Sequence, residues 1–355
     1  MPSIPATRCL RRSAAVAAFA AAALALAACS SGSSSSSSST SASTSTSASA
    51  AAKKAMNIAY LSFAVENSYD APMLAAAQAV ATTDGATMKV FDANNSPQTQ
   101  YSQLQDVINS GQYNGIIVQP IFGTGLMTLV SQAIAKGMKV VNMDQILGPD
   151  LTTDAPQVKG LSANVTFVPS EIGTKLGQQV VGACKAKNLN PCKVGYLWDI
   201  KASSLDEAIN KAFTQATAGS PVKVVAQGQS YFSPTTGLAA VQTMLQAQPG
   251  LNLIVGSDQG IEGGSQAISS AHLTGKVILV GYGASAAALQ GVKSGAWYSD
   301  VAQAPASEGR DAVTALVKAI QTGQDSGGID PVATLPNAGI VTEANVGQST
   351  AEWPG

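Results

Sequence analysis

The side chains best suited to chemistry in this sequence follow short apolar runs at regular intervals. They are neutral amides and hydroxyls, carboxylates and aromatic rings. Amides and carboxylates pair with hydroxyl groups, and an aromatic plane accepts the C–H face of a ring. The mixture therefore favours binding of a small ligand with many hydroxyls and one apolar face. The positions are Asn67, Tyr69, Asp92, Gln119, Asp144, Gln145, Trp198, Asp199, Phe232, Ser257, Asp258, Tyr282 and Gln303.

Structural roles compete with binding at several of these positions. An aspartate that ends a strand commonly caps the next turn, which is the interpretation favoured for Asp92. Gln119 would equally satisfy loop backbone, and Asp258 would serve as an N-cap for the helix after it. Trp198 suits a core position better than a binding position. Tyr69 and Phe232 would alternatively only plug the lobes, although a stacking role is favoured for both.

Residue patterns typical of catalysis are sparse. His272 is the only histidine, and no serine stands in a nucleophile-elbow pattern, so a Ser-His-acid triad is disfavoured. No phosphate-binding loop is present, and the glycines of "GSDQGIEGGSQ" alone are weak evidence for a dinucleotide. Carboxylates are numerous, but no pair stands out as a glycosidase pair. We expect a binding protein with no cofactor and no reaction of its own.

The elements that position these residues alternate between strands and helices. Near-continuous apolar strands separated by helices predict parallel sheets covered on both faces. Two such series imply two similar Rossmann-like lobes, and ligands bind beyond the carboxyl ends of strands in open parallel sheets. The strand runs are "NIAYLSF", "TMKVFD", "GIIVQP" and "KVVNMD", then "KVGYLWD", "VKVVAQG", "LNLIVGSD" and "KVILVGY".

The remainder of the chain is too short for a third lobe and must return to the first two. We assign residues 56–164 and 304–333 to the N-terminal lobe and residues 165–303 and 334–346 to the C-terminal lobe, with a tail at 347–355. Three crossings, near residues 162–166, 303–306 and 331–335, would then form a hinge.

The first 55 residues have the composition of an export and tethering segment. Arg8, Arg11 and Arg12 precede an apolar run that ends at Cys29, which predicts a signal peptide over residues 1–28. "LAAC" resembles the lipobox of bacterial lipoproteins, so Cys29 is the expected lipidation site. A plain signal peptide remains the alternative, and Sec and Tat export both remain open. Residues 29–55, rich in serine, threonine and alanine, would form a flexible linker.

Two cysteines remain after the leader cysteine Cys9 and the lipid cysteine Cys29 are set aside. In an exported protein, Cys184 and Cys192 in "CKAKNLNPC" predict a disulfide between a helix and a strand. A metal site would need further ligands nearby, and none is evident.

The charge pattern excludes several partners. The whole chain has a formal net charge of −1, and no Lys/Arg cluster occurs, so nucleic acid is not an expected partner. After the leader, no apolar stretch is long enough to span a membrane.

From Met56 to about Val346 the chain resembles the sugar-binding periplasmic proteins of bacterial ABC importers, with the ribose-binding branch of the type I fold as the closest match. The resemblance lies in the order and spacing of "IAYLSFAVENSYD", "VFDANNSPQTQ", "GIIVQP", "VVNMDQ", "SYFSPTTGLAAVQTML", "LIVGSDQG", "VILVGY" and "DVAQAP". It implies a monomeric protein on the outer face of the cell membrane that delivers a sugar or polyol to an ABC permease and its ATPase.

The resemblance also implies roles for individual residues. Asn67 and Tyr69 match first-lobe contacts to a hydroxyl and a ring, and Asp144 matches an aspartate that accepts sugar hydroxyls. Phe232 resembles the stacking aromatic of the second lobe. The remaining matches are Ser257 and Asp258, where the family often has an Asn-Asp pair, and Gln303, a polar contact near the hinge.

Three departures from the family pattern argue against ribose itself. Gln145 stands where an arginine usually follows the aspartate, and Ile209 and Asn210 stand where a helix commonly presents another arginine. Gly283 replaces an expected aspartate. Charge-assisted hydrogen bonds are about twice as strong as neutral ones, and the three departures remove charged groups that would make them. A different sugar, a sugar alcohol or another small polar molecule is therefore expected. Trp198 and Asp199 would compensate for the lost groups.

The expected mechanism is closure of the two lobes on the ligand, a population shift driven by contacts that both lobes make only when shut. Two other functions are compatible with the sequence. One is a sensory receptor subunit that reports a sugar or signal molecule to a membrane kinase. The other, less favoured, is an exported sugar-active enzyme.

Overall fold

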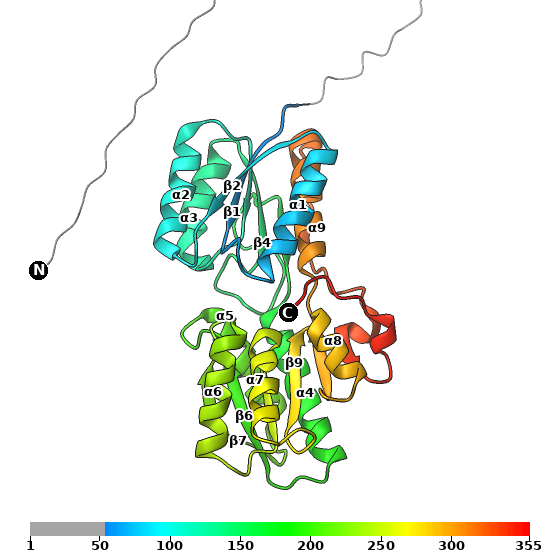
Figure 1. The fold of residues 1–355 in the computed structure, drawn as a ribbon. Coiled ribbons are helices and arrows are strands. Elements are labelled where there is room, and N and C mark those ends of the chain that lie inside the picture. The colour runs from blue at the N-terminus through cyan, green and yellow to red at the C-terminus, as the bar shows by residue number, and fades with distance from the viewer. Residues whose placement is uncertain (1–53) are drawn as a thin grey trace, which may run out of the picture. The chain divides into compact units, whose positions relative to one another are not determined.

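The computed structural model describes residues 54–355, and within them the chain forms two α/β lobes (Figure 1). Each lobe is built on one six-stranded sheet, with strand orders β11-β5-β4-β3-β1-β2 and β12-β10-β9-β8-β6-β7. All strand pairs are parallel except β10–β12, which is antiparallel. The predicted fold class, two parallel-sheet lobes, is therefore confirmed.

The first sheet and its helices come mainly from the N-terminal half of the described chain. Their bounds are β1 (Asn57–Ser62), α1 (Asp70–Thr83), β2 (Thr87–Asp92), α2 (Pro97–Ser110), β3 (Gly115–Val118), α3 (Gly123–Ala135), β4 (Lys139–Asp144), β5 (Ala163–Thr166), α9 (Pro305–Thr322) and β11 (Gly327–Ile329).

The second sheet and its helices follow β5. Their bounds are α4 (Pro169–Ala186), β6 (Cys192–Trp198), α5 (Ser204–Ala216), β7 (Val222–Gln229), α6 (Pro234–Ala247), β8 (Leu253–Ser257), α7 (Asp258–Ser270), β9 (Ile278–Gly283), α8 (Ala286–Lys293), β10 (Ser299–Ala302) and β12 (Ile340–Thr342). Two short 3₁₀ turns, Pro336–Gly339 and Val346–Gln348, flank β12.

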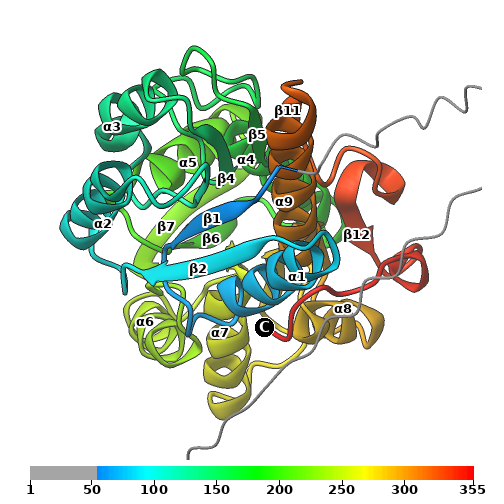
Figure 2. The ribbon, with the colours of Figure 1, turned by 90° about the horizontal axis from the view of Figure 1, so that it is seen from above.

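Helices cover both faces of the first sheet, as Figure 2 shows from above. Apolar side chains that alternate along β1 separate accordingly. Ile58 and Tyr60 pack with α1 and α9, whereas Ala59 and Leu61 pack with α2 and α3. Burial on both faces explains why these strands are continuously apolar in sequence.

The chain passes between the two sheets three times, from β5 to α4, from β10 to α9 and from β11 to β12. These passages fall where the sequence analysis places its hinge segments. A role as a hinge remains a prediction, as do the lobe boundaries.

A disulfide joins Cys184 at the end of α4 to Cys192 at the start of β6. The loop that it closes is short, and on the chain-entropy model such a link stabilises the fold by about 2–3 kcal/mol.

The predicted signal peptide, the lipidation site Cys29 and nearly all of the predicted linker lie outside the described residues. Across residues 54–355, no helix has the length and apolar character required to cross a bilayer.

Small residues let the helices approach one another closely. At the contact between α1 and α9, a Cβ atom added to Gly309 would lie 2.0 Å from the Met73 carbonyl oxygen. Gly182 in α4 is different, because the nearest atom to its added Cβ is the Tyr298 hydroxyl at 3.7 Å, an ordinary contact.

Because the space around Gly309 and Gly182 differs, replacement by alanine should have opposite effects on stability at the two positions. Gly309→Ala should lower the free energy of unfolding by about 1–3 kcal/mol because α1 and α9 must separate. Gly182→Ala should raise it by about 0.5–1 kcal/mol because alanine favours a helix. Urea denaturation of both variants measures the two signs, and a stable Gly309→Ala protein would contradict the packing.

Candidate functional site

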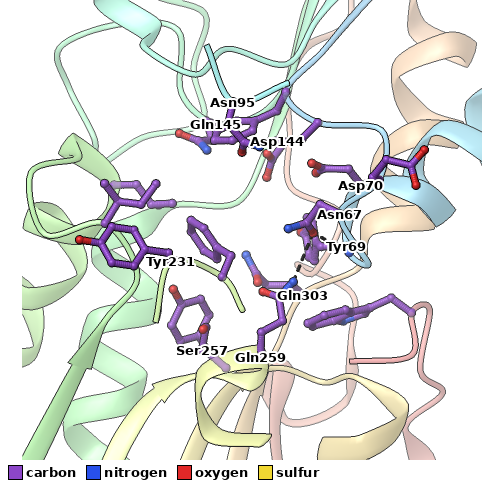
Figure 3. Close-up of a pocket in the computed structure, with 18 of the residues that line it drawn as sticks. Asn67, Tyr69, Asp70, Asn95, Asp144, Gln145, Tyr231, Ser257, Gln259 and Gln303 are labelled. Carbon is purple, nitrogen blue, oxygen red and sulfur yellow. Dashed lines mark hydrogen bonds between the residues drawn. The ribbon is translucent and has the colours of Figure 1, made fainter. Parts of the chain in front are cut away.

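A cavity of about 530 Å³ opens where the carboxyl ends of the two sheets face each other (Figure 3). Residues of both lobes and of the crossing segments line it. The lining comprises Phe63, Ala64, Glu66, Asn67, Tyr69, Asp70, Asn94, Asn95, Asp144, Gln145, Phe167, Ile200, Leu205, Tyr231, Phe232, Ser257, Gln259, Tyr282, Gln303 and Trp353.

Most of the residues singled out in the sequence analysis share this cavity. The ones that line it are Asn67, Tyr69, Asp144, Gln145, Phe232, Ser257, Tyr282 and Gln303. Asp92 is structural, as its preferred interpretation states, because its Oδ1 accepts a hydrogen bond from the Asn94 N–H at 2.9 Å.

Trp198 and Asp258 do not line the cavity, so their positions do not support the predicted ligand contacts. Trp198 packs edge-on against Tyr196, and its indole N–H donates to Gln227. Asp258 is fully buried, and its Oδ2 accepts from the Ser285 N–H at 2.7 Å. The N-cap interpretation of Asp258 is wrong, because Ser257 caps α7. The ligand contacts of Trp198 and Asp258 stay predictions.

A buried amide organises the wall contributed by the N-terminal lobe. Gln119 has no solvent exposure, and its Nε2 donates to Asp70 Oδ1 at 2.7 Å and to Asp144 Oδ2 at 3.0 Å. Its Oε1 accepts from the Phe63 N–H at 3.0 Å. One side chain thus fixes three segments that reach the cavity.

A buried carboxylate organises the opposite wall. Asp199 Oδ2 accepts from the Tyr282 hydroxyl at 2.6 Å, and its Oδ1 accepts from the Ser257 hydroxyl at 2.6 Å. The Ser230 hydroxyl donates to the same Oδ1. Asp199 therefore positions side chains of the cavity without lining it.

One glutamine of the second lobe makes hydrogen bonds across the cavity to the first lobe. Gln259 Nε2, at the start of α7, donates to Asn67 Oδ1 at 3.2 Å and to the Ser68 hydroxyl at 3.1 Å (Figure 3). Asn67 Oδ1 also accepts from the Tyr69 N–H at 2.8 Å, which fixes the amide toward the second lobe.

Left-handed backbone concentrates at the cavity. Five non-glycine residues that line it have positive φ angles, namely Asn94 (46°), Asn95 (63°), Asp144 (67°), Tyr231 (51°) and Phe232 (52°). Such conformations cost about 1–3 kcal/mol each and cluster where a fold orients side chains for function.

The C-terminal segment supplies a wall that the sequence analysis missed. Trp353 is 5% exposed, its ring meets Tyr69 edge-on at 5.3 Å between centroids, and its indole N–H donates to the Gly283 carbonyl at 2.7 Å. A Cβ added to Gly283 would lie 2.6 Å from the Trp353 ring. Gly283, which departs from the family pattern, thus makes room for the indole.

The same segment contacts both lobes. Glu352 Oε2 accepts from the Ser307 N–H at 2.7 Å, at the start of α9. The carbonyls of Trp353 and Pro354 accept from the N–H groups of Ala286 and Ala287, at the start of α8.

Burial dominates the electrostatics of the site. It raises the pKa of Asp144 to about 7 against the opposing hydrogen bond from Gln119. It raises the pKa of Asp199 to about 7 as well, with the charge of Asp206 as the next cause. The pKa of Asp70 and of Glu308 is also raised, first by burial and then by the charge of Asp144.

Asp258 and Asp300 form a fully buried pair of acids that does not line the cavity. Asp300 Oδ1 accepts from the Ala284 N–H at 2.8 Å, and the facing oxygens of Asp258 and Asp300 have no other partner in the described chain. Burial raises the pKa of both carboxyls, and the charge of Asp258 raises that of Asp300 further. One proton shared between them satisfies both oxygens.

Two parallel-sheet lobes that enclose a polar and aromatic cavity define the class of bilobal α/β binding proteins. Residues 58–325 match the model of the periplasmic binding protein domain family. The chain belongs to this family, which confirms the resemblance found in the sequence.

Curated relatives match this chain over most of their own length. The D-allose-binding periplasmic protein of Escherichia coli (strain K12) is 27% identical over 283 residues, which cover 76% of this chain and 84% of the relative. The ribose import binding protein RbsB of Bacillus subtilis (strain 168) is 25% identical over 268 residues, 74% of this chain and 81% of the relative.

Solved structures share the fold. A galactofuranose binding protein superposes with a TM-score of 0.71 at 18% identity, covering 82% of this chain and 96% of that chain. A periplasmic solute binding protein of Actinobacillus succinogenes 130z with bound D-allose has a TM-score of 0.70 at 21% identity, covering 83% and 100%.

The raised pKa values predict that folding stability falls as the pH rises. The folded chain holds protons on Asp144 and Asp199 more tightly than the unfolded chain, so this stability is complete below about pH 4 and is lost as the pH rises through about 7. The free energy of unfolding should be lower by about 2–5 kcal/mol at about pH 8 than at about pH 5. Urea denaturation measures the difference.

A substitution in the Asp258–Asp300 pair distinguishes its contribution to the pH dependence of stability from that of an exposed charge. Asp300→Asn, with a neutral amide able to donate to Asp258, should weaken the pH dependence, whereas exposed Asp106→Asn should leave it unchanged. If the free energy of unfolding changed equally with pH in wild type, Asp300→Asn and Asp106→Asn, the assignment of Asp258 and Asp300 as a buried pair would be contradicted.

We predict that removal of the Trp353 indole ring lowers the stability of the protein. Trp353→Ala should lower the free energy of unfolding by about 3 kcal/mol because a buried ring and a hydrogen bond disappear. Trp353→Phe, which keeps a ring against Tyr69, should lose less than half of that. Chemical denaturation of both variants tests this, and a Trp353→Ala protein as stable as wild type would show that the segment does not dock.

Proposed function

We propose that this protein captures a sugar or similar polyhydroxylated solute outside the cytoplasm by closing its lobes, and delivers it to an ABC permease driven by an ATPase. The observation that supports this most directly is the cavity, to which both lobes contribute amides, hydroxyls, carboxylates and rings. Family membership supports solute capture, and the names of the relatives, D-allose-binding and ribose import binding proteins, support a sugar.

The distribution of polar groups suits a ligand held from two sides. Asn67, Asn95 and Gln145 offer amides from the first lobe, and Gln259 offers an amide from the second. A hydroxyl both donates and accepts, so it pairs with either end of an amide. Contacts to both lobes exist only in the closed form, and ligand binding therefore favours closure.

Ribose is not the ligand that we propose. Gln145 lines the cavity at the position of an expected arginine, and Ile209 is buried within α5 rather than presented to a ligand. The space of a third expected charged group, at Gly283, is filled by Trp353. Recognition then depends on neutral groups, stacked rings and the acids of the first lobe.

We further propose that the protein acts as a monomer without catalysing a reaction. In this proposal, Cys29 carries a lipid and the segment after it tethers the lobes to the outer face of the cell membrane. Metabolic labelling with a fatty-acid analogue, compared between wild type and Cys29→Ala, tests the anchor.

Ligand binding should be measurable in a thermal-shift screen over pentoses, hexoses and polyols. A binder raises the melting temperature in proportion to the logarithm of its concentration over Kd. Phe232→Ala should then raise the Kd about tenfold or more, because a half-buried ring that lines the cavity is lost.

The matched control is Phe122→Ala, since Phe122 is 55% exposed and does not line the cavity. Small-angle scattering with a saturating hit should show a more compact particle. No hit in the entire screen, or equal affinities for wild type and Phe232→Ala, would refute the assignment of solute or site.

A further inference from the structure

The ionisable side chains of the cavity are acidic, and no basic side chain lines it. Its charged lining residues are Glu66, Asp70 and Asp144, and no lysine, arginine or histidine lines it. Within residues 54–355, the ion pairs join Lys139 to Asp325, Lys175 to Glu171 and Arg310 to Glu352, and none of these residues lines the cavity.

Asp144 presents an unpartnered oxygen to the cavity. Its side chain is 5% exposed and points into the space between the lobes (Figure 3). Oδ2 accepts from Gln119, whereas Oδ1 accepts no hydrogen bond from the described residues. A buried carboxylate without a cation or a full set of donors is costly, so Oδ1 is available to a hydrogen-bond donor of the ligand.

Two further acids stand beside Asp144 on the same wall. Asp70, at the start of α1, shares the Gln119 amide with it. Glu308 of α9 is fully buried, accepts from the Tyr69 hydroxyl at 3.2 Å, and has a second oxygen without a partner among the described residues. The charge of Asp144 raises the pKa of Asp70 and of Glu308 after burial, and no neighbouring cation lowers the pKa of either.

Aromatic rings line the rest of the cavity. Tyr231, Phe232 and Tyr282 come from the second lobe, Phe167 from a crossing segment and Trp353 from the C-terminal segment. Ring faces attract a desolvated cation by about 2 kcal/mol. Acids on one side and rings on the other are the surroundings that a protonated amine requires.

We propose that the solute carries a protonated nitrogen beside its hydroxyls, as an amino sugar or amino polyol does, and that its ammonium group lies against Asp144 and Asp70. This inference rests on the proposed function, of which it names the substrate class. The ammonium donates to the free Asp144 oxygen, the hydroxyls pair with the amides, and the carbon face of the solute lies on the rings.

Proton release is a consequence of this arrangement. The empty site holds protons on its acids near neutral pH, and an ammonium group favours their ionised forms. Binding of an amine should therefore release protons at mildly acidic pH, where the amine stays charged. Titration calorimetry in two buffers with different ionisation enthalpies counts them, and a neutral polyol should release none.

The test uses pairs of compounds that differ only in the nitrogen. The pairs are D-glucosamine with D-glucose, D-galactosamine with D-galactose, and N-methyl-D-glucamine with D-glucitol. In at least one pair, we expect the amine to bind about tenfold tighter than its neutral twin. Asp144→Asn, which keeps the side-chain shape and tolerates a positive φ, should remove that preference, whereas Asp106→Asn should keep it.

The outcomes separate this inference from the proposed function. It is overturned if no amine binds, if the neutral twins bind as well as the amines, or if Asp144→Asn binds an amine as wild type does. Binding of neutral sugars alone would leave the proposed function standing. Failure of every carbohydrate and polyol would remove both. Circular dichroism and thermal melting of Asp144→Asn without ligand exclude misfolding as the cause of a loss.

Discussion

The hydrogen bonds of the Gln119 side chain are the interaction on which the first wall of the cavity depends. A fully buried amide must use both its donor and its acceptor groups, and this one spans the end of β1, the start of α1 and the end of β4. Asp199 has the same role in the second lobe, where it accepts from three hydroxyls. Each lobe thus holds residues that line the cavity through one buried polar centre.

Much of the fold and part of the site could be predicted from the sequence because parallel sheets impose a simple rule. Apolar runs mark strands, and the polar residues after them must gather at one edge. The rule locates Asn67, Asp144, Phe232 and Gln303 at the cavity. The rule does not predict the direction of each side chain, and side chains that are neighbours in sequence can point either into the cavity or into the protein. Ser257 therefore lines the cavity while Asp258 turns into the protein.

Cavity residues that lie far in sequence from the strands could not be predicted in this way. Trp353 follows a segment with no apolar periodicity, and only its long-range contacts with Tyr69 and Gly283 place it in the cavity. Gly283 stands where the resemblance implies an aspartate, but its significance is steric as well as electrostatic. A side chain at this position would occupy the volume of the indole ring. Gly283, where the chain departs from the family pattern, and Trp353, which is distant in sequence, therefore pack together as one unit.

Closure and charge are coupled in such a cavity. As the lobes approach, water leaves, the effective dielectric constant falls, and both attraction to a ligand and repulsion between acids increase. An empty closed form would force Asp70, Asp144 and Glu308 to share space without counterions, so they would have to remain protonated. A ligand that supplies donors or positive charge relieves this cost only when both lobes surround it. In the function that we propose, the same carboxyls would therefore disfavour closure of the empty protein and favour closure of the occupied one.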